Sequence, residues 1–276
     1  MIIIPGSAQC LGQRQEQEDS FGFSDFDNHE LIAHAGNVAV VADGMGGLKY
    51  GREASQSALQ TFMQSYREKK ESDDIPARLL KGLFKANRAV SQLALETHDE
   101  GEVGTTLVAA VIHQDLLYWA SVGDSRLYLY RHNHLKQLTH DHTYAKELNL
   151  EVAMGVISNK EASQHPSKNA LTSYVGMKKL LLIDCNSEPF KLEEGDRLIL
   201  CSDGLYGRLD QQHMISCMRE SAQMTADKLM AMVVACRDLH QDNATVAILD
   251  YLEEPEEVPL TLMQKIKKRV WKRSEV

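Results

Sequence analysis

Short apolar runs recur along the chain, and several of them end in glycine or aspartate. The run at 37–44 is short and rich in valine, which is typical of a buried strand. Further strands are predicted at 105–112, 116–122, 126–131, 180–185, 196–203 and 244–251. Gly123 and Asp124 stand between two of these runs, and this dipeptide predicts a tight hairpin turn that joins 116–122 to 126–131.

Two pairs of helices are predicted from apolar residues that recur at helical spacing. The first helix is marked by Ala54, Ala58, Phe62 and Tyr66. The second is predicted to begin at Pro76, because the first turn of a helix tolerates proline. The second pair is expected at about 210–220 and about 225–240. The region 141–176 has weaker periodicity and predicts short helices within a long loop.

The order of these elements indicates the fold class. Strands, two helices, a run of strands, two helices and a last strand do not alternate as a doubly wound parallel sheet requires. Runs of strands with paired helices favour layered sheets that are covered by helices. The chain of 276 residues shows no internal repeat and no Gly/Ser-rich linker, so we expect one domain at 1–251.

The composition changes after Tyr251. An acidic, proline-broken linker is followed by six basic side chains around Met263, Ile266, Val270 and Trp271, which predicts an amphipathic basic helix within a tail at 252–276. Three interpretations remain open for this tail: a solvated or frayed end, contact with an anionic membrane surface, or docking onto a partner.

Charge and cysteine content exclude several classes of function. With 30 basic and 39 acidic residues the net charge is −9, which argues against nucleic-acid binding, because that needs clustered Lys and Arg. The longest apolar run, 107–112, is far shorter than the ~20 residues of a membrane helix, so no transmembrane segment is predicted. The first residues have no features of a secretory signal. Five cysteines without a CxxC pair indicate free thiols, and the cytoplasm is the expected compartment.

Candidate chemistry lies in aspartates at predicted strand ends. The set is Asp19, Asp43, Asp203 and Asp242, and glycine follows two of its members. Carboxylates on rigid elements are the ligands that hard divalent cations prefer, so the set suggests a Mg²⁺ or Mn²⁺ site. Each aspartate taken alone also fits an ordinary Asp-Gly turn or a helix N-cap, and the residues by themselves leave that alternative open.

Seven short motifs resemble a known family in their order and separation. They occupy 12–19, 41–47, 104–106, 122–128, 138–143, 201–205 and 242–245, with the sequences GQRQEQED, VADGMGG, GTT, VGDSRLY, LTHDHT, CSDGL and DNAT. The set is similar to the PPM-type metal-dependent serine/threonine protein phosphatases (the protein phosphatase 2C family) in their bacterial form, over about 7–251. The resemblance implies an α+β fold, a four-layer α/β/β/α sandwich of two antiparallel sheets flanked by helix pairs.

The resemblance also implies a site with two Mn²⁺ or Mg²⁺ ions. Asp43 would bridge both ions, and the Gly44 carbonyl would bind one of them. Asp203 and Asp242 would bind on the other side of the pair, and Asp19 would act through coordinated water. A water activated by the ions would then attack phosphorus in line, without a covalent intermediate.

Other positions in the motifs carry further expectations from the family. Arg14 would hold the substrate phosphate, and Asp124 would hold a third, weaker ion; a plain hairpin turn is the alternative for Asp124. Met45 stands where the eukaryotic form has a histidine, so the proton donor to the leaving group stays open. His140 and His142 are expected to be structural, and His165 lies in a segment that resembles the flap beside the family's cleft.

The implied function is dephosphorylation of phosphoserine and phosphothreonine in cytoplasmic proteins, opposing a serine/threonine kinase that would be the cognate partner. Two alternatives are a non-catalytic module that binds phosphoproteins and a phosphatase dedicated to a single regulator. An aspartate replaced by an apolar residue would favour the binding module, and all four positions keep their carboxylates.

Overall fold

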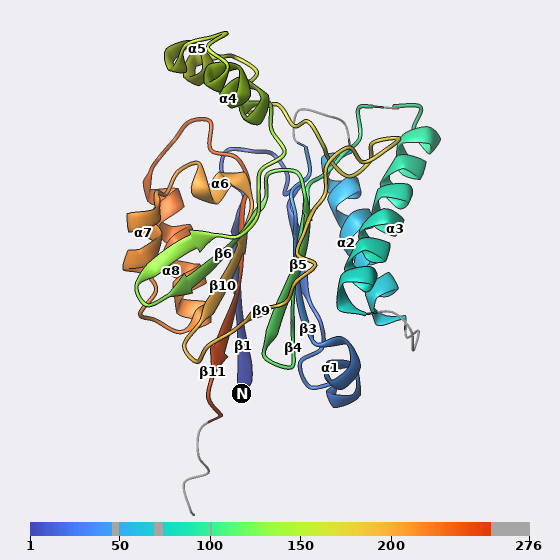
Figure 1. The fold of residues 1–276 in the computed structure, drawn as a ribbon, viewed down its shortest axis with the longest axis vertical. Helices are drawn as coiled ribbons and strands as arrows, with labels where there is room; N and C mark the ends of the chain where they lie inside the picture. The colour runs from blue at the N-terminus through green and yellow to red at the C-terminus, as the bar shows by residue number, and fades with distance from the viewer. Residues whose placement is uncertain (46–49, 69–73, 100, 255–276) are drawn as a thin grey trace, which may run out of the picture.

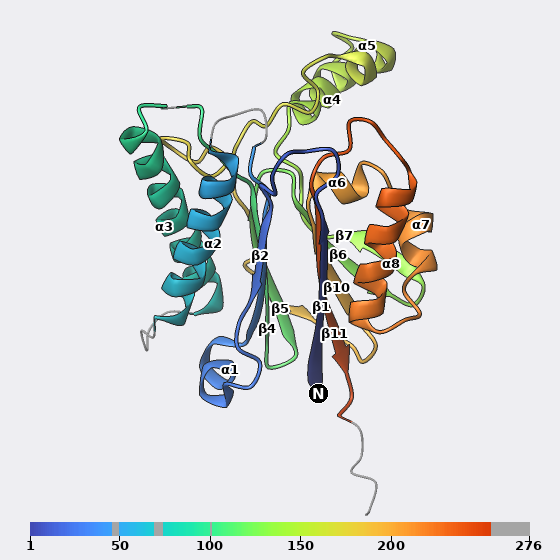
Figure 2. The same ribbon diagram turned by 180° about the vertical axis from the view of Figure 1, so that it is seen from behind.

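Two antiparallel sheets lie face to face, with helices against both outer faces (Figures 1 and 2). The computed structural model describes residues 1–45, 50–68, 74–99 and 101–254. The strands are β1 (Ile2–Cys10), β2 (Ser20–Phe23), β3 (Asn37–Ala42), β4 (Leu107–His113), β5 (Leu116–Val122), β6 (Arg126–Arg131), β7 (His134–Gln137), β8 (Asp184–Cys185), β9 (Phe190–Lys191), β10 (Arg197–Cys201) and β11 (Ala244–Leu252). The helices are α1 (His29–Ala35), α2 (Gly51–Arg67), α3 (Ile75–Glu96), α4 (Ala145–Ala153), α5 (Asn159–Gln164), α6 (Asp203–Tyr206), α7 (Gln211–Ser216) and α8 (Ala222–Ala235).

One sheet has the strand order β1-β11-β10-β6-β7 and the other has the order β2-β3-β4-β5-β8, with β9 also paired to β5. Helices α7 and α8 cover the first sheet, and α2 and α3 cover the second (Figure 1). The predicted α+β sandwich of four layers is therefore confirmed.

Three apolar layers separate the four layers of secondary structure. Side chains alternate along each inner strand: in β10, Leu198 and Leu200 pack between the sheets, whereas Ile199 and Cys201 pack against α8 and its neighbours. Strand β3 shows the same alternation between the middle layer and the layer under α2 and α3. All six residues of β3 are buried, which explains why the five that follow Asn37 form a continuous apolar run.

The predicted hairpin between 116–122 and 126–131 is wrong. Strands β5 and β6 have the predicted bounds, but β5 pairs with β4 and β8 in one sheet, and β6 pairs with β10 and β7 in the other. Residues 123–125 thus carry the chain across the end of the sandwich. Gly123 has φ +102°, and a Cβ there would lie 2.6 Å from the Thr106 side chain, so the crossover requires glycine.

Some elements differ from the sequence prediction. Only Asp184 and Cys185 of the predicted strand at 180–185 pair with β5, while Leu180 and Ile183 pack against the apolar layer under α3. The pattern did not predict β1, β2, β7, β9, α1 or α6. Helix α3 does carry proline in its first turn, and the Asp74 side chain accepts a hydrogen bond from the Ala77 amide as its N-cap.

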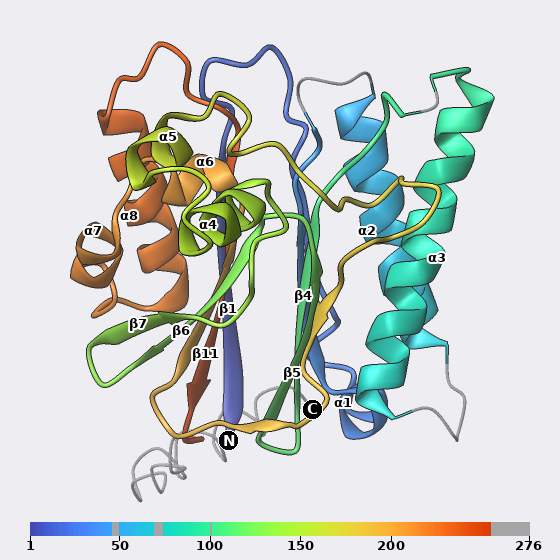
Figure 3. The ribbon, with the colours of Figure 1, turned by 45° about the horizontal axis from the view of Figure 1, so that its top comes forward.

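Helices α4 and α5 confirm the short helices expected within 141–176, and they protrude beyond the sheets at the end where α6 lies (Figures 1 and 2). Figure 3 shows the molecule with this end turned toward the viewer. Among the described helices, none has the length and apolar content needed to cross a bilayer. Most of the tail at 252–276 lies outside the described residues.

Candidate active site

The structure brings the predicted aspartates together at one end of the sandwich. Asp43 directly follows β3, Asp203 opens α6 just after β10, and Asp242 precedes β11. Electrostatic interactions connect Asp43 with Asp19, Asp203, Asp124 and Asp242, in decreasing order of strength. Strands from both sheets therefore end beside one another and present five carboxylates to a common region.

Asp19 is the most enclosed of these carboxylates, with 5% of its surface exposed. Its Oδ2 accepts hydrogen bonds from Ser202 Oγ at 2.8 Å and from Thr245 Oγ1 at 2.6 Å. Burial nevertheless raises the pKa of Asp19 to about 6, and the negative charge of Asp203 adds to this rise. Two hydroxyl donors thus orient the side chain without neutralising it.

Asp43 is fixed through its backbone. Its amide donates to Thr106 Oγ1 at 3.0 Å, and its carbonyl accepts from the Thr106 amide at 2.8 Å and from Thr105 Oγ1 at 2.8 Å. Burial raises the pKa of the Asp43 carboxyl, and four neighbouring aspartates raise it further. At Gly44, a Cβ would lie 2.3 Å from the Gly51 carbonyl oxygen, so only glycine fits after Asp43.

Asp203 lies where β10 passes into α6. Burial, followed by the charge of Asp242, raises the pKa of Asp203, and a hydrogen bond with the Asp43 side chain opposes this rise. A Cβ at Gly204 would lie 1.9 Å from the Asn243 carbonyl oxygen. The segment that carries Asp203 is therefore packed directly on the segment that carries Asp242.

Arg14 and Asp242 form an ion pair at the edge of the cluster. The Nη2–Oδ2 distance is 2.6 Å, and the two side chains are 37% and 40% exposed. The neighbouring Asn243 is buried: its Nδ2 donates to the Leu11 carbonyl at 2.9 Å, and its Oδ1 accepts from the Glu18 amide at 2.8 Å. Asn243 therefore holds the loop that carries Arg14 against the last strand.

Asp124 lies in the crossover between the sheets. Burial raises its pKa to about 7, and the charges of Asp203 and Asp141 act in the same direction. Its carbonyl oxygen accepts a hydrogen bond from the Tyr206 hydroxyl at 3.0 Å. Asp124 is thus close enough to Asp203 for their charges to interact.

The carboxylates have too little positive charge around them. Burial raises the pKa of four of them, and like charges raise it further, so a cation placed among them would relieve both effects. Within the described residues, no group of three or more His, Cys, Asp or Glu side chains is arranged to hold one metal ion as it stands. The donor chemistry of these carboxylates nevertheless suits divalent cations.

The histidines near the site have the expected structural surroundings. His142 is buried, and its Nδ1 accepts from the Gly123 amide at 3.1 Å, while burial lowers the pKa of its imidazole. His140 is exposed and contacts Asp184 at 3.2 Å. His165 ends α5 and lies 5.4 Å, between ring centroids, from Tyr144 at the start of α4, so it belongs to the protruding helices.

A family profile for protein phosphatase 2C matches residues 8–236. The chain belongs to the protein phosphatase 2C family. It is 32% identical over 241 residues to the serine/threonine phosphatase stp of Listeria welshimeri, which covers 86% of this chain and 91% of that protein. It is 31% identical to the protein phosphatase PhpP of Streptococcus pneumoniae, over 84% of this chain and 93% of that protein.

Solved structures of this phosphatase family share the fold. The serine/threonine phosphatase of S. agalactiae superposes with a TM-score of 0.75 at 28% identity, covering 91% of this chain and all of that one. The catalytic domain of the phosphatase PstP, solved in complex with two manganese ions, has a TM-score of 0.70 at 26% identity, covering 91% and 99%. As a member of the protein phosphatase 2C family, this chain is a hydrolase.

Sequence reasoning missed the hydroxyl side chains that position the aspartates. Ser202 and Thr245 contact Asp19, and Thr106 fixes the backbone of Asp43. Each of them lies inside one of the seven motifs, and Ser202 and Thr245 stand next to or close to an aspartate, so the motifs themselves contained the signal. Tyr206 lies just after one motif, and no pattern in the sequence identified it.

Proposed function

We propose that this protein phosphatase 2C removes phosphate from phosphoserine and phosphothreonine in proteins, using two divalent ions held among its aspartates. The ions would be Mn²⁺ or Mg²⁺, and Asp43, Gly44, Asp203 and Asp242 would hold them, with Asp19 acting through coordinated water. The observation that carries this proposal is the cluster of carboxylates whose pKa values burial and mutual repulsion raise. When bound, such ions act as Lewis acids and lower the pKa of a water molecule, which supplies the nucleophile.

The chain's own residues give the site its geometry. Asp43 interacts with carboxylates from both sheets, so its side chain is the one that can reach two ions at once. Ser202 and Thr245 orient Asp19 from the side of the sheet that contains β10 and β11. These two hydroxyl contacts would hold Asp19 in place before substrate binds.

Arg14 is proposed to hold the substrate phosphate. Its side chain is 37% exposed and lies within 2.6 Å of Asp242, at the outer edge of the cluster. A planar guanidinium donates two parallel hydrogen bonds to phosphate oxygens, which suits it to charge that spreads over the equatorial oxygens. Asn243 supports this position because it anchors the loop before and after Arg14.

The wider setting of the enzyme follows from the relatives and the chain. We infer that its substrates are phosphorylated Ser/Thr proteins of the cytoplasm and that a serine/threonine kinase is its partner. All five cysteines are free thiols, which agrees with a reducing compartment. We also propose that the phosphatase domain is 1–251 and that the tail at 252–276 contacts a partner or an anionic surface.

The test is release of phosphate from a phosphothreonine peptide at neutral pH, with Mn²⁺, with Mg²⁺ or with chelator. Asp203→Asn is expected to lower kcat/KM at least about 100-fold, because an amide replaces a carboxylate ligand. Asp210→Asn is the matched control, because Asp210 is exposed and caps α7, a role that asparagine also fills.

Metal-dependent release that falls in Asp203→Asn and persists in Asp210→Asn supports the proposal. If the wild-type protein binds Mn²⁺ and releases no phosphate from any peptide, the proposal of an enzyme is wrong and the protein is a non-catalytic module. Release from one phosphoprotein alone would indicate a phosphatase dedicated to a single regulator.

A further inference from the structure

Tyr206 connects two segments that carry active-site aspartates. It is the last residue of α6, the short helix that Asp203 opens. Its hydroxyl donates a hydrogen bond of 3.0 Å to the carbonyl oxygen of Asp124, in the crossover between the sheets. A single side chain thus joins the helix of one carboxylate to the turn of another.

The aromatic ring of Tyr206 is held by a contact with Arg126. The guanidinium carbon of Arg126 lies 3.5 Å from the ring centroid, which is a close cation–π contact. Arg126 is fixed in turn by Asp141, with Nε–Oδ1 at 3.0 Å and Nη2–Oδ2 at 2.7 Å. A bidentate pair of this kind sets the plane of the guanidinium, and so it limits how the ring can tilt.

The crossover that carries Asp124 is held by contacts on both sides of this residue. The backbone on one side of it is held by His142, whose Nδ1 and amide both bond to Gly123. On the other side, Ser125 Oγ lies 2.6 Å from Thr106 Oγ1. The Tyr206 hydroxyl is the described contact that holds the Asp124 carbonyl itself.

We infer that Tyr206 is a positioning residue that holds Asp124 against α6 and thereby sets how tightly Asp124 binds a divalent ion beside Asp203. The inference rests on the proposed metal-dependent function. It concerns the strength of one ion site, and it leaves the binding of ions at Asp43 and Asp242 unchanged.

The experiment is a titration of the full chain with Mn²⁺, with free Mn²⁺ measured by electron paramagnetic resonance. Tyr206→Phe keeps the ring over Arg126 and removes only the hydroxyl, so the protein is expected to fold. Tyr128→Phe is the matched control, because the Tyr128 hydroxyl contacts Arg126 at 2.9 Å and is not bonded to Asp124. Asp124→Asn identifies the class of bound ions that depends on Asp124.

We expect the wild type to show a weak class of Mn²⁺ that Asp124→Asn abolishes. Tyr206→Phe should weaken this class about tenfold, as loss of an outer contact to a metal ligand does, while Tyr128→Phe leaves it unchanged. Phosphate release by Tyr206→Phe should then need more Mn²⁺ for half-maximal activity and reach the wild-type kcat in excess Mn²⁺, which a loss of folded protein would not do.

Three results would overturn the inference: equal Mn²⁺ affinity in Tyr206→Phe and the wild type, an equal loss in Tyr128→Phe, or no class of ions that depends on Asp124. Failure of the proposed function has a different signature. In that case the wild-type protein releases no phosphate at any Mn²⁺ concentration, whatever the titration shows.

Discussion

Buried carboxylates occur in two regions of this sandwich, and their surroundings are opposite. At the base of the first sheet, Asp250 on β11 receives Arg197 of β10 through two contacts, Nε–Oδ1 at 2.5 Å and Nη2–Oδ2 at 2.8 Å. At the active-site end, Asp19 accepts hydrogen bonds from the hydroxyls of Ser202 and Thr245, and the charges that act on Asp43 among the described residues are those of four other aspartates. One region is neutral within itself, and the other carries excess negative charge.

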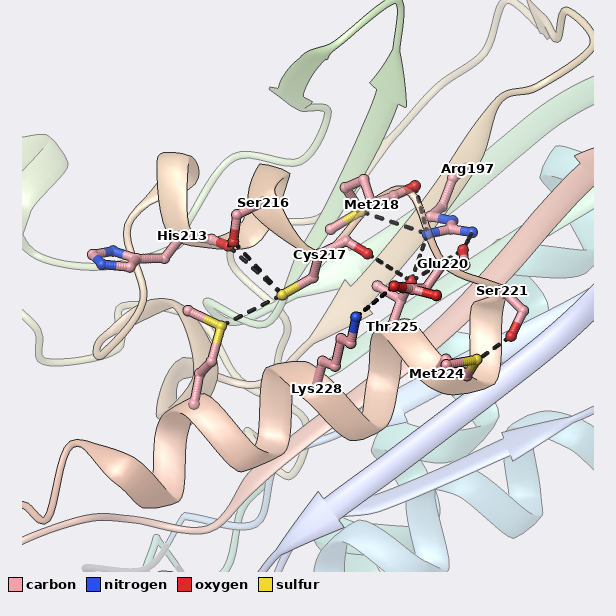
Figure 4. Close-up of polar contacts among 11 residues, drawn as sticks. Arg197, His213, Ser216, Cys217, Met218, Glu220, Ser221, Met224, Thr225 and Lys228 are labelled. Atoms are coloured by element: carbon pink, nitrogen blue, oxygen red, sulfur yellow. Dashed lines mark hydrogen bonds and ion pairs between the residues drawn. The ribbon is translucent and has the colours of Figure 1, made fainter.

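The neutral region is also saturated with hydrogen bonds. Figure 4 shows Arg197 beside the connection between α7 and α8. Its Nη1 donates to Thr225 Oγ1 at 2.7 Å and to the Met218 carbonyl at 3.2 Å, and its Nη2 donates to the Glu220 carbonyl at 2.6 Å. This pair therefore has a structural role: it fastens the outer helices to the sheet.

The contrast teaches how a buried acid is assigned to structure or to function. A buried carboxylate that is already paired with a guanidinium gains no electrostatic stabilisation that would favour binding another cation. A group of carboxylates without one is unfavourable until a cation arrives, and such an arrangement is typical of functional sites. The same fold therefore contains a stable ion pair and a site that requires a ligand.

The largest effect on stability is expected from removing the guanidinium that pairs with Asp250. Arg197→Met should lower the free energy of unfolding by about 3–5 kcal/mol, because it leaves Asp250 buried without a countercharge. The measurement is urea unfolding of the metal-free protein. Lys228→Met is the control: Lys228 pairs with Glu220 on the surface at 2.5 Å and should contribute under about 1 kcal/mol. Equal losses in the two variants would contradict the contrast.

Metal should stabilise the charged region by a smaller amount. At Mn²⁺ one hundred times above its dissociation constant, the free energy of unfolding should rise by about 2.7 kcal/mol for one binding site. Thermal unfolding with and without Mn²⁺ measures this rise. Asp203→Asn should lose most of it, whereas Asp210→Asn should keep it. A rise of the same size in both variants would place the bound metal outside the cluster.

The site was more predictable from sequence than the neutral region. Each candidate aspartate follows an apolar run or stands in a short motif. Local pattern alone left ordinary turns and helix caps open, and the resemblance of the seven motifs to a known family selected these residues. Arg197 and Asp250 are 53 residues apart and lie inside apolar strands, where no local pattern connects them. Their pairing follows from the register of β10 on β11, which places Arg197 opposite Asp250. The local sequence pattern contains no information about that register.

The mistakes about the fold have similar physical causes. The sequence pattern did not predict β1, which contains Pro5 and lies at the edge of its sheet beside β11, where proline is tolerated. Gly123-Asp124 is a common hairpin dipeptide, and only the pairing of each strand with other neighbours shows that the turn passes between sheets. The apolar run at 180–185 is only partly buried: Leu180 and Ile183 pack under α3, Leu181 is exposed, and only the last two residues join a ladder.

The same substitution, threonine to valine, can be made in each of the two regions. Thr225→Val removes one partner of Arg197 and should lower the free energy of unfolding by about 1–2 kcal/mol, with Mn²⁺ affinity unchanged. Thr245→Val removes a donor to Asp19 and should weaken Mn²⁺ binding about tenfold. Unfolding curves and Mn²⁺ titrations of both variants test this. If Thr225→Val weakened Mn²⁺ binding as much as Thr245→Val does, the two regions would not be independent.

The smallest effect is expected from removal of residues 255–276, which follow both regions in the sequence. The ladder between β1 and β11 closes with Ile2 opposite Leu252, and the Tyr251 carbonyl accepts a hydrogen bond from the Gly195 amide at 2.9 Å. A chain that ends at Glu254 keeps these contacts, so its free energy of unfolding should change by under about 0.5 kcal/mol. Its kcat/KM on a short phosphothreonine peptide should equal that of the full chain. A fall of tenfold or more on this peptide would show that the tail acts on the catalytic centre, whereas a fall confined to whole phosphoproteins would assign the tail to docking.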